Sequence, residues 1–383
     1  MQPGELPDPI LITHPRQLEA LAKTLASEAI LAVDTESNSL HAYREQVCLV
    51  QFTTSQADYL VDPLVLLDLS PLAGLFSNSN IEKIFHAAEY DLVCLKRDFG
   101  FSFANLFDTM LAARILGRPG VGLGSLLESE FGAPLDKRFQ RANWGQRPLP
   151  PSLLAYARLD THYLIDLRHR LKAELEKKRR WLLADEDFQR LSNINERDFE
   201  PEVEPDFSIN GGKDLTPQQN AVLLELCKYR DRIARLQDRP LFKIMGAKTL
   251  LAIAEACPTS PEKLGHLPGM SARQVQRHGR HLLQAVQRGL HAQPVFPHRP
   301  QRRDEQMLAR LELLREWRKR TAQEMQVESD VILPRDIMYD IAAHQPRSDA
   351  ELAALMTEVP WRLSQFGPQI LKILAGERNK VKV

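Results

Sequence analysis

The residues best suited to chemistry in this sequence are acidic, and the first two of them lie close together. Asp34 and Glu36 occur in the stretch AVDTES, directly after the apolar run from Ile30 to Val33. In an extended strand residues i and i+2 point to the same face, so both carboxylates can converge on one point. Two carboxylates held together are costly unless a cation neutralises them, and a hard divalent ion such as Mg²⁺ or Mn²⁺ would do so.

Two further acidic residues and a tyrosine follow along the chain. Asp91 ends the motif FHAAEYD, where we expect the first turn of a helix, and the helix dipole alone could account for it. Tyr156 and Asp160 occur in LLAYARLDTHYLIDL. Because residues i and i+4 share one face of a helix, their side chains project into the same space. A tyrosine at this spacing is usually a core residue, whereas a carboxylate on a buried face needs a partner.

Together these four carboxylates predict a site for two metal ions. Two divalent ions roughly 3.5–4 Å apart can activate water on one side of a phosphodiester and stabilise the leaving oxygen on the other. Tyr156 would then position the attacking water or help to deprotonate it. Zinc is not expected, because the cysteines are scattered and lack metal-ligand spacing. They are Cys48, Cys94, Cys227 and Cys257.

The elements that must position these residues alternate between strands and helices. Strands are predicted at Ile30–Val33, Val47–Thr53, Asp58–Val61 and Ile81–His86. Helices are predicted at Glu89–Arg97, Leu106–Leu116 and Leu123–Phe131, followed by one long helix from Pro151 toward Arg180. This order favours an α/β or α+β sheet protein for the first part of the chain.

Two segments without periodicity divide the chain. Residues 196–216 are acidic and contain two prolines and a Gly-Gly pair, and residues 291–302 contain three prolines. Both read as linkers. They separate units at about 1–200, 210–290 and 303–378. The last two units match each other without a gap at an offset of 88 residues, for example Tyr229 with Trp317 and Arg230 with Arg318. Each copy has the pattern of a small all-helical bundle.

The charge of the chain is distributed unevenly. Lys+Arg and Asp+Glu both number 50, which seems to argue against a nucleic-acid partner. However, residues 1–206 contain 31 acidic and 22 basic side chains, whereas residues 207–383 contain 19 acidic and 28 basic ones. A basic half joined to an acidic half suggests that the basic part binds a polyanion, although solvated faces without a partner would look the same. The chain shows no secretory signal or membrane span, so we expect a cytoplasmic location.

The motifs VDTES, FHAAEYD and YARLD, in that order, resemble the three motifs of DEDD 3′→5′ exonucleases, and Tyr156 resembles the tyrosine of the DEDDy subgroup. The stretches VCLVQF, FDTMLAARILG and NWGQRPLPPSLLAYARLD resemble ribonuclease D, and the C-terminal repeats resemble HRDC domains. The resemblance implies an RNase H-like α/β exonuclease domain, a mixed sheet flanked by helices, over residues 1–200. Two small all-α HRDC bundles would follow, at 210–290 and 303–378.

The resemblance also implies an activity and residue roles. It implies hydrolytic release of nucleoside 5′-monophosphates from RNA 3′ ends, with tRNA precursors as substrates and two Mg²⁺ or Mn²⁺ ions as cofactors. Asp34 would contact both ions, and Glu36 and Asp160 would contact the ion on the water side. Asp91 would act on the leaving-group side, and Tyr156 would hold the water. No membrane and no obligatory protein partner is expected.

Further residues are candidates for substrate contacts. We expect Gln51, His86, Trp144 and Arg147 to serve the exonuclease domain, together with Arg138 and Arg141. Trp144 could stack on a base or could equally anchor a loop in the core. In the first helical copy the candidates for phosphate contacts are Arg230, Arg232, Arg235, Arg239, Lys243, Arg273, Arg277 and Arg280. The second copy departs from the HRDC pattern around Val359–Ser364, which leaves its contact with RNA open.

Two other functions fit part of these observations. A 3′→5′ DNA exonuclease uses the same four carboxylates, and only the appended helical pair and the stretch before Asp160 favour RNA. A noncatalytic nucleic-acid-binding scaffold would need a degenerate site, yet all five catalytic positions are present in the sequence.

Overall fold

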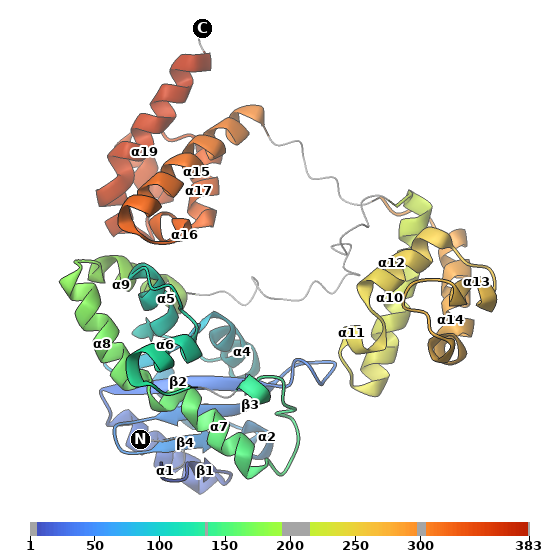
Figure 1. Ribbon diagram of the computed structural model, residues 1–383, viewed down its shortest axis with the longest axis horizontal. Coiled ribbons are helices and arrows are strands. Elements are labelled where there is room, and N and C mark those ends of the chain that lie inside the picture. Colours follow the sequence, from blue (N-terminus) through green and yellow to red (C-terminus); the bar gives the residue numbers. More distant parts are fainter. Residues whose placement is uncertain (1–5, 135–136, 194–214, 297–303, 382–383) are drawn as a thin grey trace. The chain divides into compact units, whose positions relative to one another are not determined.

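A computed structural model describes residues 6–134, 137–193, 215–296 and 304–381 (Figure 1). Most of both predicted linkers lies outside these residues. The described part groups into two compact units. One contains the N-terminal sheet domain and the second helical domain, and the other contains the first helical domain together with residues 37–46. In the described residues no helix has both the length and the apolar composition needed to cross a bilayer.

The sheet domain contains a mixed six-stranded sheet in the described residues, with the order β1-β4-β3-β2-β5-β6. The pairs β1 with β4, β2 with β5 and β5 with β6 are parallel, whereas β3 and β4 are antiparallel. The predicted fold class is confirmed. The strands are β1 (Ile10–Ile12), β2 (Ile30–Ser37), β3 (Val47–Thr53), β4 (Asp58–Val61), β5 (Glu82–Phe85) and β6 (Leu106–Asp108).

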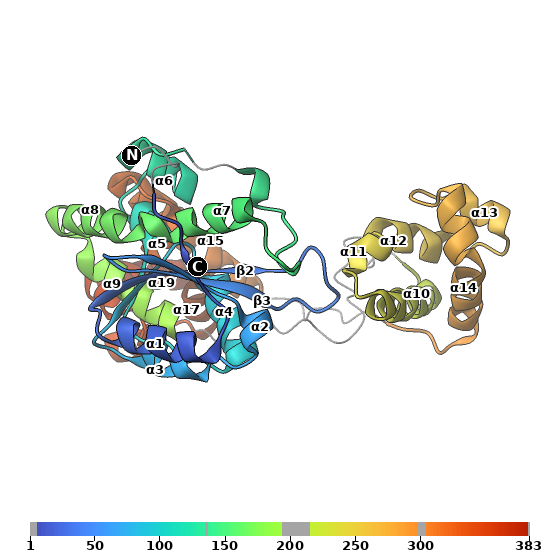
Figure 2. The same ribbon diagram turned by 90° about the horizontal axis from the view of Figure 1, so that it is seen from below.

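Helices cover both faces of this sheet (Figure 2). Leu31 and Val33 of β2 join the core beneath α1 and α4, whereas Ala32 joins the core of the opposite face. This alternation places the next even-numbered residues, Asp34 and Glu36, on the side of Ala32. The helices of the domain are α1 (Pro15–Ala26), α2 (Pro63–Leu66), α3 (Ala73–Ser77), α4 (Glu89–Phe99), α5 (Thr109–Ile115), α6 (Leu123–Phe131), α7 (Pro151–His162), α8 (Leu164–Lys177) and α9 (Trp181–Ser192).

Several local predictions differ from the structure. The segment Leu106–Leu116, predicted as a helix, begins as the strand β6, because its first apolar residues pair with β5. The strand β2 continues past Asp34 to Ser37, and the sequence did not indicate β1 or α1. The predicted long helix is interrupted at Tyr163. This break lets α7 pack against β3 and β4 while α8 packs against α5.

The first helix of the first helical domain begins where the sequence predicts. The Thr216 hydroxyl accepts a hydrogen bond from the Gln219 amide and caps the first helix. In the same compact unit, the Tyr43 hydroxyl donates a 2.6 Å hydrogen bond to Asp231, and the Arg235 guanidinium lies 5.6 Å from the centre of the Tyr43 ring. The helices are α10 (Pro217–Gln237), α11 (Leu241–Ile244), α12 (Ala247–Ala256), α13 (Pro261–Gly265) and α14 (Ala272–His291).

The second helical domain repeats the first in detail. Its first three helices begin and end 88 residues after α10, α11 and α12. Arg230 hydrogen-bonds the carbonyl of Met245, and Arg318 hydrogen-bonds the carbonyl of Leu333 in the equivalent position. Arg230 is 9% exposed and so holds the fold of its domain, which contradicts its prediction as a phosphate contact. The helices are α15 (Glu305–Met325), α16 (Ser329–Ile332), α17 (Arg335–His344), α18 (Asp349–Leu355) and α19 (Pro360–Val381).

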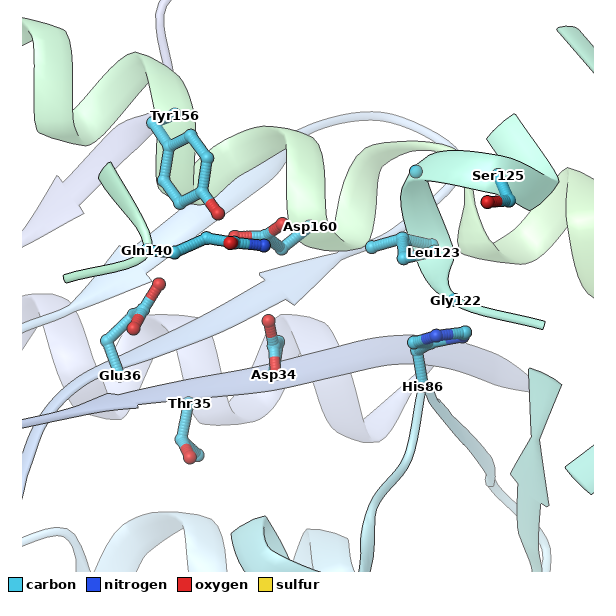
Figure 3. Close-up of a pocket in the computed structure, with 11 residues that line it drawn as sticks. Asp34, Thr35, Glu36, His86, Gly122, Leu123, Ser125, Gln140, Tyr156 and Asp160 are labelled. Carbon is cyan, nitrogen blue, oxygen red and sulfur yellow. The ribbon is translucent and has the colours of Figure 1, made fainter. Parts of the chain in front are cut away.

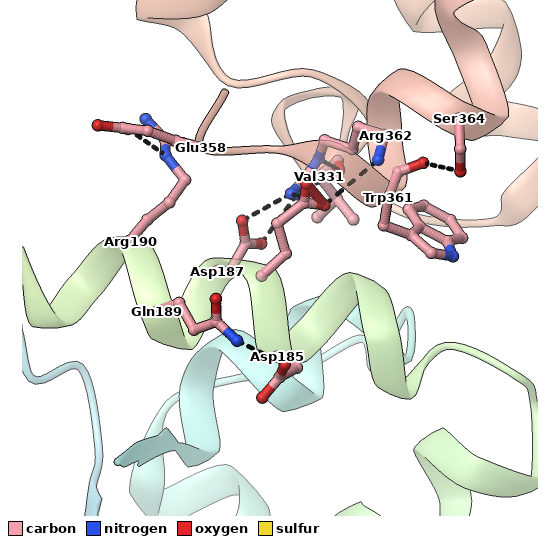
Figure 4. Close-up of polar contacts among 10 residues, drawn as sticks. Asp185, Asp187, Gln189, Arg190, Val331, Glu358, Trp361, Arg362 and Ser364 are labelled. Atoms are coloured by element: carbon pink, nitrogen blue, oxygen red, sulfur yellow. Dashed lines mark hydrogen bonds and ion pairs between the residues drawn. The ribbon is translucent and has the colours of Figure 1, made fainter. Parts of the chain in front are cut away.

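The second helical domain packs against the sheet domain around one buried arginine (Figure 4). Arg362, at the start of α19, is fully buried and pairs with Glu186 at 3.3 Å and Asp187 at 2.9 Å on α9. It also donates a 2.9 Å hydrogen bond to the carbonyl of Val331. Arg362 lies within Val359–Ser364, the segment where the second copy departs from the HRDC pattern. The departure therefore serves packing between the two domains.

A glycine completes this contact on the side of the sheet domain. Gly117 has a φ of +74°, and a Cβ built there would lie 2.1 Å from the carbonyl oxygen of Gln326. No side chain fits in that space. Arg190 of α9 adds a 2.6 Å ion pair with Asp336 of α17.

Candidate active site

A cavity of about 500 Å³ in the sheet domain collects most of the predicted catalytic side chains (Figure 3). Asp34, Glu36, Tyr156 and Asp160 line it. The other residues of the lining are Thr35, His86, Gly122, Leu123, Gly124, Ser125 and Gln140. Carboxylates from β2 and α7 thus face one another across a space large enough for part of a nucleotide strand.

The strand β2 and the helix α7 bring these groups together from opposite sides. Asp34 and Glu36 are two residues apart on β2, and their side chains point toward α7 (Figure 3). Tyr156 and Asp160 lie one turn apart on α7, as the i and i+4 spacing predicts.

Polar contacts fix the end of α7 over the sheet. Thr161 shares a 2.8 Å hydrogen bond with Thr53 of β3, and His162 lies 2.8 Å from Asp58 of β4. These contacts hold the turn that carries Asp160.

Asp91 lies near the cavity but is not part of its lining. It occupies the first turn of α4, as predicted, and its carboxylate accepts a hydrogen bond from the hydroxyl of Thr35. Thr35 lies between Asp34 and Glu36 on β2 and points away from both of them (Figure 3). The structure therefore connects Asp91 to the other carboxylates through the middle residue of the VDTES motif.

Burial, and then the charges of their neighbours, disfavour the ionisation of the four carboxylates. Burial, followed by the charge of Asp160, raises the pKa of Asp34 well above its ordinary value. Burial and the charges of Asp34, Asp160 and Asp91 raise the pKa of Glu36 to about 10. The pKa of Asp91 is raised by burial and Asp34, and that of Asp160 is raised to about 7 by burial and Asp91. The site thus concentrates negative charge that protons or cations must compensate.

The donor set fits hard divalent cations, which prefer carboxylate oxygens. Asp34, Glu36 and Asp160 would hold such ions at the cavity wall, with Asp91 close behind. In the arrangement observed here, no three Asp, Glu, His or Cys side chains of the described residues are grouped as a ready metal site. The fit of this site to divalent cations therefore rests on the chemistry and charge of the donor side chains.

The structure supports some of the predicted substrate-binding residues of the sheet domain and contradicts others. His86 lines the cavity, as a substrate contact requires. Trp144 is 2% exposed and packs 6.2 Å from the ring of Tyr156, so it anchors the core and cannot stack on a base. Arg147 is held by Asp62 through hydrogen bonds of 2.6 and 2.7 Å and donates to the carbonyl of Cys48. Its guanidinium is committed to the fold, which contradicts its predicted role in binding substrate.

Gln51 differs from the prediction in another way. It is fully buried on β3, and neither its amide oxygen nor its amide nitrogen has a hydrogen-bond partner in the described part of the chain. Its neighbours two residues away on the same strand, Leu49 and Thr53, both contact α7. Gln51 therefore lies beneath the helix that carries Tyr156 and Asp160, where it cannot reach substrate directly.

The sequence did not indicate several residues of the cavity. Gly122 to Ser125 form the start of α6, and Gln140 follows the short turn at Lys137–Phe139. A signal for the first of these was available, because a glycine directly before the apolar run LGSLL is typical of a helix start near a ligand. Gln140 carries no such signal. Arg138 and Arg141, the predicted contacts beside it, are exposed.

Comparisons with known proteins agree with this architecture. The family model described as 3′-5′ exonuclease matches residues 9–176, and the HRDC domain model matches residues 219–286 and 307–374. The structure of the catalytic core of RRP6 from Trypanosoma brucei is 30% identical, with a TM-score of 0.63 over 76% of this chain and 82% of that chain. Escherichia coli RNase D, at 24% identity, shares the fold, with a TM-score of 0.70 over 97% of this chain and 99% of that chain.

Curated relatives fall into two groups. RRP6-like proteins 3 and 1 of Arabidopsis thaliana are 32% and 31% identical over 65% and 75% of this chain, but the chain spans 30% and 47% of their lengths. Ribonuclease D of Nitrobacter hamburgensis is 30% identical over 96% of this chain and 95% of that protein. Since the match to a ribonuclease D extends over nearly the whole of both chains and the exonuclease and HRDC models occur in the same order, the chain belongs to the ribonuclease D family of 3′-5′ exonucleases.

Proposed function

We propose that this protein is a metal-dependent 3′→5′ exoribonuclease that releases nucleoside 5′-monophosphates from RNA 3′ ends and acts on tRNA precursors in the cytoplasm. The observation that carries the proposal is the single cavity in which Asp34, Glu36, Asp160 and Tyr156 meet. Once ionised, these carboxylates repel a phosphodiester unless cations are bound. Family membership supports the direction of cleavage.

The side chains of the cavity have distinct parts in the proposed reaction. When bound, two divalent cations supply positive charge to the scissile phosphate and lower the pKa of water. Asp34 would hold both ions, Glu36 and Asp160 the ion beside the attacking water, and Asp91 would act on the leaving-group side. The phenol of Tyr156 would orient the water toward phosphorus. The ring of Tyr156 is fixed for this task by Phe139 at 5.6 Å and by Trp144 at 6.2 Å.

The first HRDC domain is proposed to hold the RNA upstream of the cut. Arg273, Arg277 and Arg280 are exposed on α14, and their spacing places them along one face of that helix. Three such cations suit a row of phosphates. We assign the exonuclease domain to residues 1–200 and the HRDC domains to 210–290 and 303–378. Asp330 of α16 and Arg362 of α19 in the second domain are engaged by ion pairs with the sheet domain, so we assign RNA binding to the first.

One assay tests the activity. The protein is incubated with a tRNA precursor, single-stranded RNA and single-stranded DNA, each with Mg²⁺, with Mn²⁺ or with chelator, and the products are identified. Metal-dependent release of 5′-mononucleotides from RNA 3′ ends is expected. Internal cuts would refute the proposal, and a strong preference for DNA would favour the alternative of a DNA exonuclease.

Variants test the residue roles in the same assay. Asp34→Asn should abolish hydrolysis while RNA binding persists, and Tyr156→Phe should lower the rate about 10²-fold. Tyr59→Phe is the matched control, because Tyr59 packs on the opposite face of the sheet. A rate for Tyr156→Phe equal to that of the control would reduce Tyr156 to a packing residue.

The salt dependence of RNA binding tests the role of α14. Replacing Arg273, Arg277 and Arg280 by glutamine should reduce the slope of log binding constant against log salt by about 2, since each phosphate contact to a single strand contributes about 0.7. An unchanged slope would show that these arginines do not contact RNA.

A further inference from the structure

One histidine of the cavity has a donor and acceptor pattern that the fold determines. His86 follows β5 and lies toward the end of the cavity away from Glu36 and Tyr156 (Figure 3). Its Nδ1 lies 2.9 Å from the hydroxyl oxygen of Thr109, a residue that is completely buried. His86 makes no other hydrogen bond among the described residues. Its Nε2 is therefore the ring nitrogen left for a ligand.

The partner of Thr109 decides which nitrogen carries the proton. The Thr109 hydroxyl donates its single hydrogen to the carbonyl of Phe85, at 3.0 Å. A carbonyl can only accept, so the hydroxyl oxygen can interact with Nδ1 only as an acceptor. Nδ1 must then carry the hydrogen. Burial also lowers the pKa of His86 to about 4, so the ring is neutral at physiological pH. Nε2 is left as a hydrogen-bond acceptor without a hydrogen.

An acceptor in this position selects among the groups of a nucleic-acid strand. Phosphate oxygens and the bridging ester and ring oxygens of the sugar cannot donate a hydrogen bond. Donors on the bases differ from one base to another, so an exonuclease that moves along any sequence cannot depend on them. The 2′-hydroxyl is a donor that every ribonucleotide carries and every deoxyribonucleotide lacks.

We propose that Nε2 of His86 accepts a hydrogen bond from the ribose 2′-hydroxyl of one of the two nucleotides that flank the scissile phosphate, and that His86 thereby discriminates RNA from DNA. This role rests on the proposed function, because it requires an RNA strand in the cavity. The Thr109 hydroxyl and the Phe85 carbonyl act as positioning groups that fix the tautomer of His86.

The test is a set of single-atom changes in the substrate combined with His86→Phe, which keeps the ring and removes the acceptor. The substrates are an all-ribose oligonucleotide, two versions with one 2′-deoxy sugar at the last or the penultimate nucleotide, and one with a 3′-deoxy end. Single-turnover kcat/KM is measured for each. For wild type we expect one 2′-deoxy substitution to lower kcat/KM roughly tenfold, the effect of about 1.4 kcal/mol. For His86→Phe the same substitution should have less than about a twofold effect.

Folding of His86→Phe is checked separately by hydrogen exchange of β5 and α5, which should match that of wild type. A His86→Phe protein that retains the tenfold preference would overturn the proposal. So would a wild type that is indifferent to both 2′-deoxy changes, or one whose preference concerns the 3′-hydroxyl alone. If wild type releases no nucleotides from RNA, the proposed function itself fails.

A second pair of variants tests the tautomer. Thr109→Ser keeps the hydroxyl and should keep the tenfold preference for the 2′-hydroxyl. Thr109→Val removes the acceptor for Nδ1, allows the other tautomer and should reduce that preference to about threefold or less. Equal preferences in the two variants would contradict the part assigned to Thr109.

Discussion

Without a cation, replacing a carboxylate of the proposed catalytic site is expected to stabilise this protein. The variant is Asp160→Asn, which keeps the shape of the side chain and removes its charge. Asp160 is 8% exposed, and burial together with the charge of Asp91 raises its pKa from 3.8 to about 7. Because the folded state holds this proton more tightly than the unfolded state, Asp160 favours folding least at high pH.

The direction and size of this change in stability follow from the linkage between proton binding and folding. A raised pKa contributes no penalty below the unfolded pKa near 4, and the penalty grows as pH rises toward 7, above which it is complete. Each pKa unit corresponds to about 1.4 kcal/mol, so the full shift amounts to roughly 4 kcal/mol. The neighbouring carboxylates share the same protons, and we therefore expect a gain of about 2–4 kcal/mol for Asp160→Asn at pH 8.

The measurement is hydrogen exchange of β2 and α7 in chelator at pH 4 and pH 8, because a chain with several domains does not unfold as one unit. The control is Glu128→Gln, an exposed position on α6, which should change nothing. Saturating Mg²⁺ should make wild type more stable than Asp160→Asn, because wild type binds the ion better. A ligand at 100 times its Kd stabilises the protein by about 2.7 kcal/mol. A variant that is less stable than wild type at pH 8, or equally stabilised at both pH values, would refute the reasoning.

Three further predictions concern stability. Gln51→Leu should raise the free energy of unfolding by about 1–3 kcal/mol, because it removes a buried amide without partners, and urea unfolding followed by hydrogen exchange in β3 would show it. Gly117→Ala should detach the second HRDC domain, because the new Cβ collides with the carbonyl of Gln326, and proteolysis should then cut faster in α15 to α17 than in wild type. Arg362→Ala should lower the free energy of unfolding by about 3–5 kcal/mol, since it leaves the buried Glu186 without its partner. Combining Arg362→Ala with Glu186→Gln should recover part of that loss. A single variant as stable as wild type would contradict the buried pair.

The positions of the proposed catalytic groups followed from the sequence because local periodicity controls them. The i and i+2 spacing on a strand and the i and i+4 spacing on a helix gave the correct faces for Asp34, Glu36, Tyr156 and Asp160. These arguments depend only on backbone geometry, which neighbours in the chain determine. The same holds for the ungapped repeat, whose helix boundaries recur at the expected offset.

The partners of the charged side chains did not follow from the sequence, because residues far along the chain supply them. Arg147 pairs with Asp62, 85 residues earlier, and Arg362 pairs with Glu186, 176 residues earlier. A surface arginine and a buried arginine look alike in a sequence. The break at Tyr163 was equally hidden, since neither proline nor glycine marks it.

The duplicated arginines, Arg230 and Arg318, have an implication for how the two helical copies can be changed. Each guanidinium secures the carbonyl at the end of a short helix from inside its own copy. The surfaces have diverged: Phe242 is 57% exposed in the first copy, whereas its counterpart Asp330 pairs with Arg114 of the sheet domain. The second copy thus uses this position for attachment to the sheet domain, whereas the equivalent position of the first copy is exposed. Transplanting the outer residues of one copy onto the other is a direct route to re-engineering either surface.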